Sequence, residues 1–307
     1  MGTDSICKFI SKHPSLYCPG YYGTAFSVDI YNEKKYIDYL NCTHNVFMWH
    51  DHDVRPLFSG SIPIKYDRLL HPVRHPYDQA RACYNSSLQQ SIIKNLNHPS
   101  IEAYMSDMGY FDFNHSLKYT KYYSFFDKVR IIEFSKLSNS FFIETMNDVL
   151  SWIGVEPMPK NFDFHCDHKD IDYFIENIPL VIKYIGGEIS LFFIDKGRAI
   201  SKNVYLIGEI IDCKFGDLVM YITVEDLYIN RKVISTIGLE NFKKIIEDKM
   251  DEWSLLVLSQ FEIFSEKKIN HLPDSIIDSL NAICKNDYKN VLEQYPEIDN
   301  IWSDKWR

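Results

Sequence analysis

Two strand-to-helix units in the first half of the chain constrain its fold more than any other feature. In "IKYDRLLHPVRHPYDQARACYNSSLQQSIIKNL", a short strand near residues 66–71 is followed by a turn and a long helix that Pro76 opens. "KVRIIEF" is typical of a buried strand, and a second helix follows it. Strands that alternate with helices at this spacing predict a parallel sheet with helices on both faces. Sheets of this kind bind ligands at the carboxyl ends of their strands.

The boundaries of these elements follow from individual residues. Pro72 cannot donate a ladder hydrogen bond, so we place it at the carboxyl end of the first strand. In the second unit, Gly154 is expected to end the helix. One face of that helix is marked by apolar residues at helical spacing, namely Phe142, Met146, Val149, Leu150 and Ile153.

The pattern changes near Glu188. "EISLFFID", "NVYLIGEII" and "DLVMYITV" read as strands joined by short turns at 195–202 and 212–216, which predicts an antiparallel insert. Helical spacing returns from Phe242 to Val257 and again after Pro273. A further helix is expected at 33–40.

Composition narrows the function classes. The 33 basic and 42 acidic residues leave a formal net charge of -9, which argues against a nucleic-acid partner. The seven cysteines form no CxxC pair, so reduced thiols and a cytoplasmic location are expected. The sequence predicts neither a signal peptide nor a membrane span, because no apolar stretch approaches the roughly 18 residues that a span needs.

Two segments carry residues suited to phosphate. The opening "MGTDSICKFISKHPSLY" places Gly2, Thr3, Asp4 and Ser5 directly before an amphipathic helix that Pro14 ends, and backbone N–H groups at such a helix start favour an anion. In "VRHPYDQARACY", Arg74 ends a strand two residues before a helix begins, a position from which a guanidinium can hold a phosphate. An ordinary surface salt bridge is the alternative for Arg74.

These segments resemble the motifs of sulfotransferases that use 3'-phosphoadenosine 5'-phosphosulfate (PAPS). "RHPYDQARACY" is similar to the family's 3'-phosphate motif R-x-P-x-D-x-x-x-S-x-Y, and the opening resembles its 5'-phosphosulfate loop K-S-G-T-T-x-L with a later His-Pro. "KVRIIEFSKL" looks like the strand that ends in Y-E-D-L, so that Phe134 would lie near the adenine. The tail up to "DNIW" resembles the closing helix and tryptophan of the bacterial and carbohydrate-type branch. Together the matches cover about 1–155 and 270–302.

The sequence also departs from the family pattern. The loop lysine and the first strand of the sheet would lie before residue 1, so the phosphosulfate loop is expected to be incomplete. Ala82 stands where the family has a serine that contacts the 3'-phosphate, and Arg81 is a weak substitute because it points about 100° around the helix. A chain with these losses could instead be a non-catalytic relative that binds a nucleotide or a partner.

The resemblance also points to a catalytic base. "MWHDHDVRPL" stands where cytosolic members carry a histidine, so His50 is the expected base and His52 the second choice. An ordinary solvated turn is the alternative. Zinc is a competing interpretation of "HDHD" with "HCDH" at 165–168, but neither cluster has helix-based or CxxC spacing, so no metal is expected.

The resemblance therefore implies an α/β, P-loop-like, three-layer α/β/α domain with a central parallel sheet, a β-rich insert and C-terminal helices. The expected division is a PAPS-binding core at 1–175, an insert at 176–236 and a helical part at 237–307 that completes the domain. The expected activity is transfer of a sulfuryl group from PAPS to a hydroxyl or amine of a small molecule, sugar or lipid. A homodimer is left open, and an unrelated P-loop kinase is disfavoured because G-x-x-x-x-G-K-[ST] does not occur.

Overall fold

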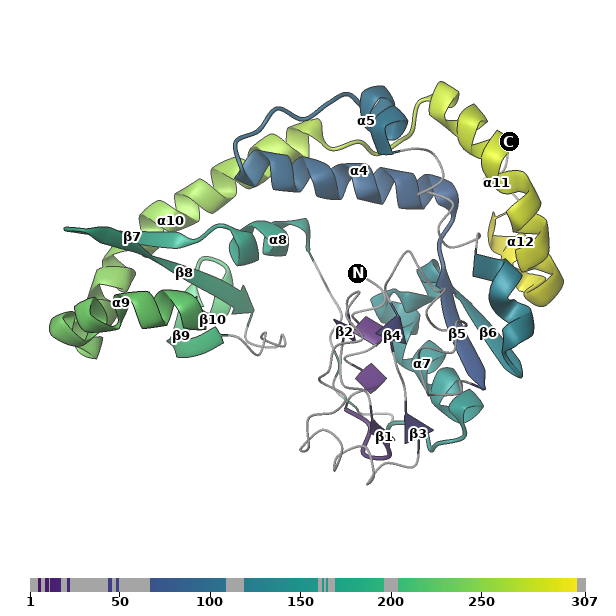
Figure 1. Ribbon diagram of the computed structural model, residues 1–307, viewed down its shortest axis with the longest axis horizontal. Coiled ribbons are helices and arrows are strands. Elements are labelled where there is room, and N and C mark those ends of the chain that lie inside the picture. Colours follow the sequence, from purple (N-terminus) through teal and green to yellow (C-terminus); the bar gives the residue numbers. More distant parts are fainter. Residues whose placement is uncertain are drawn as a thin grey trace. The chain divides into compact units, whose positions relative to one another are not determined.

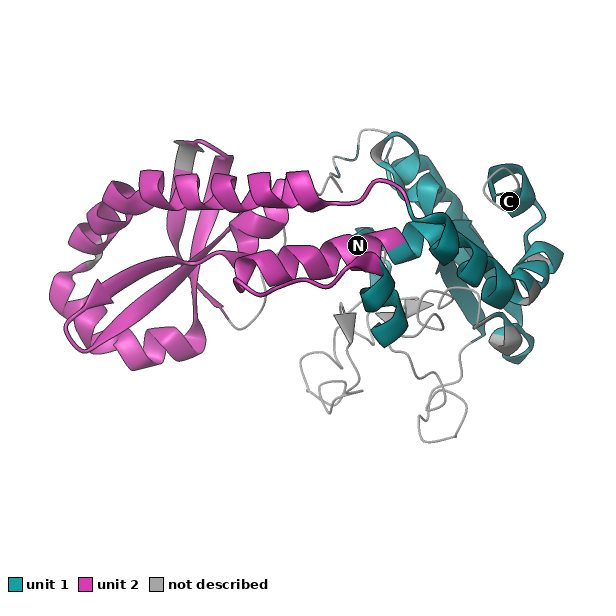
Figure 2. Cartoon of the chain, turned by 90° about the horizontal axis from the view of Figure 1, so that it is seen from above, with its two compact units in different colours: residues 1–80, 102–166, 272–307 teal, residues 81–101, 167–271 magenta. Residues whose placement is uncertain are grey.

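The chain is a mixed α/β protein with a small parallel sheet and an antiparallel sheet (Figure 1). The computed structural model describes residues 5–6, 9–10, 12–17, 21–22, 44–45, 48–49, 67–108, 119–159, 162, 164, 169–195 and 204–302. Figure 2 shows two compact units, unit 1 with residues 1–80, 102–166 and 272–307, and unit 2 with residues 81–101 and 167–271. Among the described residues, no helix combines the length and the apolar character that crossing a bilayer requires.

Unit 1 is built around two parallel strands, β5 (Arg68–Val73) and β6 (Lys128–Glu133). Their register pairs Val73 with Glu133, so the two strands end side by side. Pro72 lies next to last in β5, as predicted from its missing N–H. The remaining elements of this unit are β1 (Leu16–Tyr17), β2 (Tyr21–Tyr22), β3 (His44–Asn45), β4 (Met48–Trp49), η3 (Tyr119–Phe125), η4 (Phe134–Leu137), α7 (Asn139–Ile153), α11 (Asp274–Gln294) and α12 (Glu297–Trp302).

Helix α7 packs on one face of the parallel pair. Its Met146 is fully buried in a cluster that also contains Ile132 of β6. The predicted stop at Gly154 is confirmed, since its φ of 99° lies in the left-handed region and its N–H donates to the Leu150 carbonyl at 3.0 Å. Because successive strand residues point to opposite faces, Glu133 lies on the other face of the sheet from Ile132.

Unit 2 contains a four-stranded antiparallel sheet in the order β7-β8-β10-β9. Its helices are α8, α9 and α10. The part of α4 (Pro76–Ile93) from Arg81 onward also belongs to this unit, as does Ile101, the first residue of α5 (Ile101–Met108). The bounds are β7 (Leu180–Tyr184), β8 (Gly187–Asp195), β9 (Val204–Cys213), β10 (Gly216–Thr223), α8 (Asp170–Asn177), α9 (Val224–Ile237) and α10 (Leu239–Lys267).

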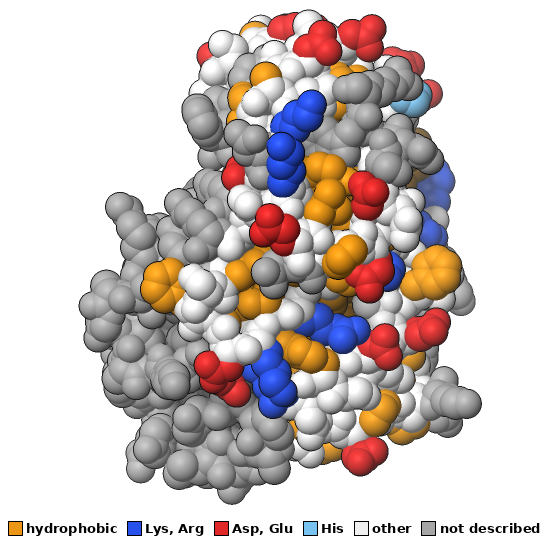
Figure 3. Space-filling model, turned by 90° about the vertical axis from the view of Figure 1, so that its right-hand side faces the viewer, with side chains coloured by type: hydrophobic (Ala, Val, Ile, Leu, Met, Phe, Trp, Pro, Cys, Tyr) orange, Lys and Arg blue, Asp and Glu red, His pale blue; other side chains and the backbone are white. Residues whose placement is uncertain are grey.

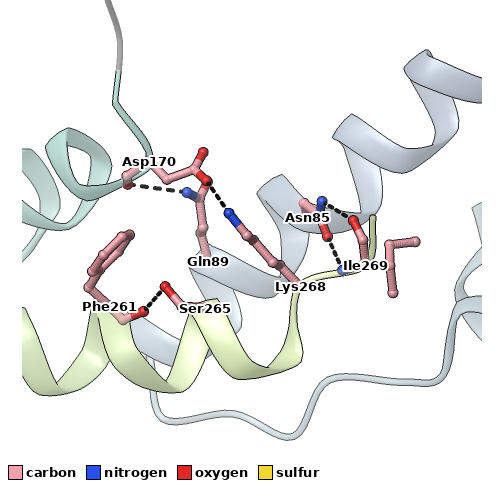
Figure 4. A network of polar contacts seen from close by, with 7 residues as sticks. All are labelled: Asn85, Gln89, Asp170, Phe261, Ser265, Lys268 and Ile269. Atoms are coloured by element: carbon pink, nitrogen blue, oxygen red, sulfur yellow. Dashed lines mark hydrogen bonds and ion pairs between the residues drawn. The ribbon is translucent and has the colours of Figure 1, made fainter. Parts of the chain in front are cut away.

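Three segments of unit 2 meet in a polar network (Figure 4). The Asn85 amide of α4 donates to the Ile269 carbonyl and accepts from the Ile269 N–H, with both hydrogen bonds 3.0 Å long. Lys268 forms an ion pair of 3.1 Å with Asp170, the first residue of α8. The network thereby joins α4, the start of α8 and the segment after α10, three pieces that lie far apart in the sequence.

The three predicted strands of the insert and the predicted helices after them are confirmed. The predicted start of α4 at Pro76 is confirmed as well. β7, α8 and α9 are additions that the sequence patterns did not predict. The contacts group α10 with the antiparallel sheet, whereas the expected division placed it in a separate part at 237–307. The helix expected at 33–40 and most of the turn at 195–202 lie outside the described residues.

Candidate functional site

The residues that follow the two parallel strands form the candidate site. Arg74 comes directly after β5 and Phe134 directly after β6, and the Arg74 guanidinium carbon lies 4.4 Å from the centre of the Phe134 ring. Both side chains are half-buried. Pro76 then begins α4, so Arg74 lies beside the positive end of a helix dipole. The edge therefore joins a fixed cation, a helix start and an aromatic ring.

The buried Glu133 holds the backbone that carries Phe134. Its carboxylate accepts hydrogen bonds from the N–H and the hydroxyl of Ser135, and it acts as the N-cap of η4. On its other oxygen it accepts from the indole Nε1 of Trp302 at 3.1 Å. Since only 2% of Glu133 is exposed, these bonds are what make burial of its carboxylate tolerable.

Aromatic side chains surround the start of α4. The ring of the fully buried His75 lies 5.1 Å from that of Trp302 and 4.5 Å from that of Tyr77, edge to face in both cases. The Tyr77 hydroxyl donates to Asn281 of α11. These contacts attach α4, α11 and α12 to one another next to Arg74.

Only part of the predicted phosphosulfate loop can be located. Ser5 and Ile6 are helical, and Ile6, Phe9 and Ile10 are buried in the same cluster as Ile132, so the predicted apolar face of this helix is confirmed. Gly2, Thr3 and Asp4 lie outside the described residues. The distance between this loop and Arg74 therefore stays a prediction.

Some of the remaining predicted site residues are described by the structure, and others lie outside the described residues. His50 and His52 lie outside the described residues, as does the 165–168 cluster. Ala82 lies within α4, and its methyl group offers no hydrogen bond. Arg81 donates to the Asn270 carbonyl at 2.8 Å, which gives its guanidinium a structural contact within unit 2.

One titratable pair near the sheet was not predicted. Nδ1 of His71, in the middle of β5, lies 2.7 Å from the hydroxyl of Tyr123 in η3. Loss of solvation lowers the pKa of His71 to about 4 and raises the pKa of Tyr123. His71 is therefore neutral near pH 7 and shares a hydrogen bond with a neutral phenol.

Glu133 is the site residue that sequence reasoning missed. The available signal was an acidic residue at the end of an otherwise apolar strand in "RIIEF", since a buried carboxylate requires hydrogen-bond partners. Within the described part of the chain, no three His, Cys, Asp or Glu side chains gather as a metal site would require. In comparisons with protein-family models, curated proteins and solved structures, the chain has no match.

Proposed function

We propose that the carboxyl edge of β5 and β6 binds a nucleotide that carries a 3'-phosphate, and that the chain is a PAPS-dependent sulfotransferase. The observation that carries this proposal is the stacking of Arg74 on Phe134 beside the start of α4. The finer fold assignment, a P-loop-like three-layer domain, belongs to the same proposal. It is supported by a parallel strand pair with α7 on one face and the Trp302 contact on the other.

The stacked arrangement suits recognition of a phosphate. A guanidinium that lies on an aromatic ring uses its flat face for that contact, while its N–H groups point outward in its own plane. Two such donors match two phosphate oxygens. The helix start adds a favourable potential for negative charge, which typically contributes about 0.3–1 kcal/mol. An aromatic side chain at this edge can also pack against a nucleobase.

The reaction assigns roles to the other predicted residues. An acceptor hydroxyl or amine attacks the sulfur, the sulfur–oxygen bond to the 5'-phosphate breaks, and 3',5'-ADP leaves. We assign binding of the 5'-phosphosulfate to Gly2, Thr3, Asp4 and Ser5. We assign removal of the acceptor proton to His50, with His52 as the second choice. The acceptor is a small molecule, a sugar or a lipid.

A non-catalytic nucleotide-binding relative is the second candidate. Two observations favour it: Ala82 cannot replace the hydroxyl that the family uses, and Arg81 is engaged with the Asn270 carbonyl. With fewer donors around the 3'-phosphate, such a protein retains nucleotide binding through Arg74 and lacks sulfuryl transfer.

Two measurements on the full chain separate these functions. Calorimetry measures binding of 3',5'-ADP, and transfer of label from sulfur-labelled PAPS to an acceptor in a cell extract measures turnover. Binding with turnover supports the enzyme, and binding without turnover supports the non-catalytic relative. Absence of binding overturns both.

A matched pair of variants tests the role of the ring. Phe134→Leu removes the surface under Arg74 and should weaken 3',5'-ADP binding about fivefold, because stacking by an aromatic group is worth on the order of 1 kcal/mol. Phe125→Leu, at a phenylalanine of η3 that is 60% exposed, should leave binding unchanged. Equal effects of the two substitutions would contradict the role of Phe134.

A further inference from the structure

His75 is a fully buried residue between β5 and α4, directly after Arg74. Its carbonyl accepts a hydrogen bond of 2.9 Å from the Gln79 N–H, as the carbonyl of an N-cap residue does. Nδ1 of its imidazole accepts another, of 3.2 Å, from the Tyr77 N–H. An N-cap side chain most often offers an oxygen to this N–H, and here a ring nitrogen does so. His75 therefore caps α4 with its side chain as well as with its backbone.

The hydrogen bond from Tyr77 determines the protonation state of the His75 ring. Nδ1 can accept this bond only through a lone pair, so the proton of the neutral imidazole lies on Nε2. An imidazolium carries an N–H at both nitrogens and cannot accept a hydrogen bond. The cap consequently requires a neutral His75 in the Nε2–H tautomer.

Burial on both sides of Arg74 fixes its backbone. Val73, the last residue of β5, is fully buried, as is His75, whose ring packs edge to face on two aromatic rings. The Arg74 side chain therefore extends from an anchored backbone to the Phe134 ring. A side chain that is already held in one direction loses less conformational entropy when it binds a ligand.

The start of α4 itself has few N–H groups to give to a phosphate. Pro76, its first residue, has no N–H, and the N–H of Tyr77, its second residue, is bonded to His75. The helix start thus contributes a favourable potential. Hydrogen bonds from this turn to a phosphate are left mainly to the Arg74 guanidinium, so the direction of that side chain decides recognition.

The charge of the protein does not favour a phosphate in general. Figure 3 views unit 1 from the side on which β6 lies in Figure 1, and among the residues coloured there basic and acidic side chains are interspersed. The chain as a whole has a formal net charge of -9. A phosphate is therefore attracted by single, well-held cations rather than by an excess of positive charge, which makes the support of Arg74 important.

We propose that His75 is a positioning residue of the nucleotide site: its neutral ring caps α4 and holds Arg74 where the guanidinium meets the 3'-phosphate. The proposal rests on the proposed function, because the phosphate is the ligand assigned to Arg74 there. His75 does not contact the nucleotide, since it is fully buried. Its substitution therefore acts on the nucleotide only through the turn that carries Arg74.

Two substitutions separate the ring of His75 from its hydrogen bond. His75→Asn keeps an acceptor for the Tyr77 N–H, because asparagine is among the best N-cap residues, but it loses the ring packing. His75→Phe keeps an aromatic ring and has no acceptor. His271→Asn, at an exposed histidine, is the matched control. Calorimetry on the full chain gives the ratio of the affinities for 3',5'-ADP and adenosine 5'-monophosphate in each variant, and urea midpoints give its stability.

The affinity ratio should be unchanged in His75→Asn and His271→Asn and about fivefold smaller in His75→Phe, because loss of the N-cap frees the turn at Arg74. Both substitutions of His75 should lower the urea midpoint, since each leaves part of a buried contact unmade. A purely structural role would predict instead that the ratio falls with the midpoint in both variants.

Two further measurements use no nucleotide. Nitrogen NMR of the unmodified chain at pH 7.5 should show His75 as the neutral Nε2–H tautomer. Hydrogen exchange of the Tyr77 N–H should be faster in His75→Phe than in His75→Asn. If both results are obtained and the unmodified chain binds no 3',5'-ADP, the proposed function fails and the role of His75 in it fails too, while the cap of α4 stands.

Three results would overturn the positioning role in a chain that does prefer 3',5'-ADP. One is a His75 ring that carries a proton on Nδ1. Another is an unchanged affinity ratio in His75→Phe. The third is an equal loss of the ratio in both His75 variants, which would assign the effect to ring packing rather than to the cap.

Discussion

The indole Nε1 of Trp302 donates a hydrogen bond of 3.1 Å to Oε1 of Glu133, although the two residues are 169 positions apart. The bond connects α12 to the end of β6, and Glu133 uses its other oxygen to hold the turn that carries Phe134. A residue of the last described helix thus supports the aromatic surface under Arg74. We infer that α12 helps to position the candidate site.

Trp302→Phe tests this link. The substitution keeps an aromatic ring but leaves a buried carboxylate oxygen without its donor, so it should lower the free energy of unfolding by about 1–3 kcal/mol. Urea unfolding followed by far-ultraviolet circular dichroism measures the change. Affinity for 3',5'-ADP should fall as well, because the turn at Phe134 loses support.

Glu133→Gln supplies a second view of the same link. A Gln side chain can still accept from Trp302 through its carbonyl oxygen, but its amide group then faces the Ser135 N–H, and two donors meet. We expect destabilisation comparable to that of Trp302→Phe. If both variants unfold at the same urea concentration as the unmodified chain, the bond does not support the turn.

Asn85→Ala tests the network that holds unit 2 together. It removes both hydrogen bonds to Ile269 and should destabilise unit 2 by about 1–3 kcal/mol. Ser265→Ala is the matched control in the same network, because the Ser265 hydroxyl only returns to the Phe261 carbonyl one turn earlier in its own helix. Hydrogen exchange of α10 should accelerate in the first variant and stay the same in the second (Figure 4).

His71 gives the fold a predictable sensitivity to acid. Its pKa is about 4 in the folded chain, below the ordinary value of 6.5. As the pH falls from 6.5 to 4, the imidazole of residue 71 takes up a proton in the unfolded chain before it does so in the folded chain. The free energy of unfolding therefore decreases between about pH 6.5 and pH 4. His71→Gln cannot take up that proton, and its stability should decline less over this window.

Urea midpoints at pH 7.5 and pH 4.5 measure this effect. Between the two pH values, the free energy of unfolding should fall less in His71→Gln than in the unmodified chain. The two decreases should differ by on the order of 2–3 kcal/mol at most. His271→Gln replaces an exposed histidine and should behave like the unmodified chain. Parallel acid profiles for His71→Gln and the unmodified chain would contradict the assignment.

Local patterns predicted the elements whose boundaries depend on single residues. Pro76 marks the start of α4 and Gly154 the end of α7, because proline suits a first helical position and glycine a left-handed cap. The strands β8 and β10 were predicted from their apolar content and the turns beside them. Arg74 was predicted from its place between a strand and a helix start, and Phe134 was predicted from the resemblance of "KVRIIEFSKL" to the sulfotransferase motif.

Other elements depend on tertiary packing. "VEDLYINRKVISTI" contains many β-branched residues, yet it forms α9, because Thr223 caps its start through the Asp226 N–H and Asn230 is buried against Tyr184. β7 has only five residues and pairs with β8 across the turn that contains Gly186. No sequence periodicity predicts the contact between Glu133 and Trp302, because it joins residues from two segments that are distant in the sequence.

Nucleotide preference is the most direct measurement of the central claim that Arg74 binds a 3'-phosphate. Calorimetry compares 3',5'-ADP with adenosine 5'-monophosphate, which lacks only that group, in the unmodified chain, in Arg74→Ala and in Arg231→Ala. Arg231 is the matched control, since its guanidinium also lies over an aromatic ring, 4.9 Å from that of Tyr228 in α9.

We predict that the unmodified chain and Arg231→Ala bind 3',5'-ADP at least about tenfold more tightly than adenosine 5'-monophosphate. Arg74→Ala should bind the two nucleotides equally. Equal binding of both nucleotides by the unmodified chain, or an undiminished preference in Arg74→Ala, would contradict the claim.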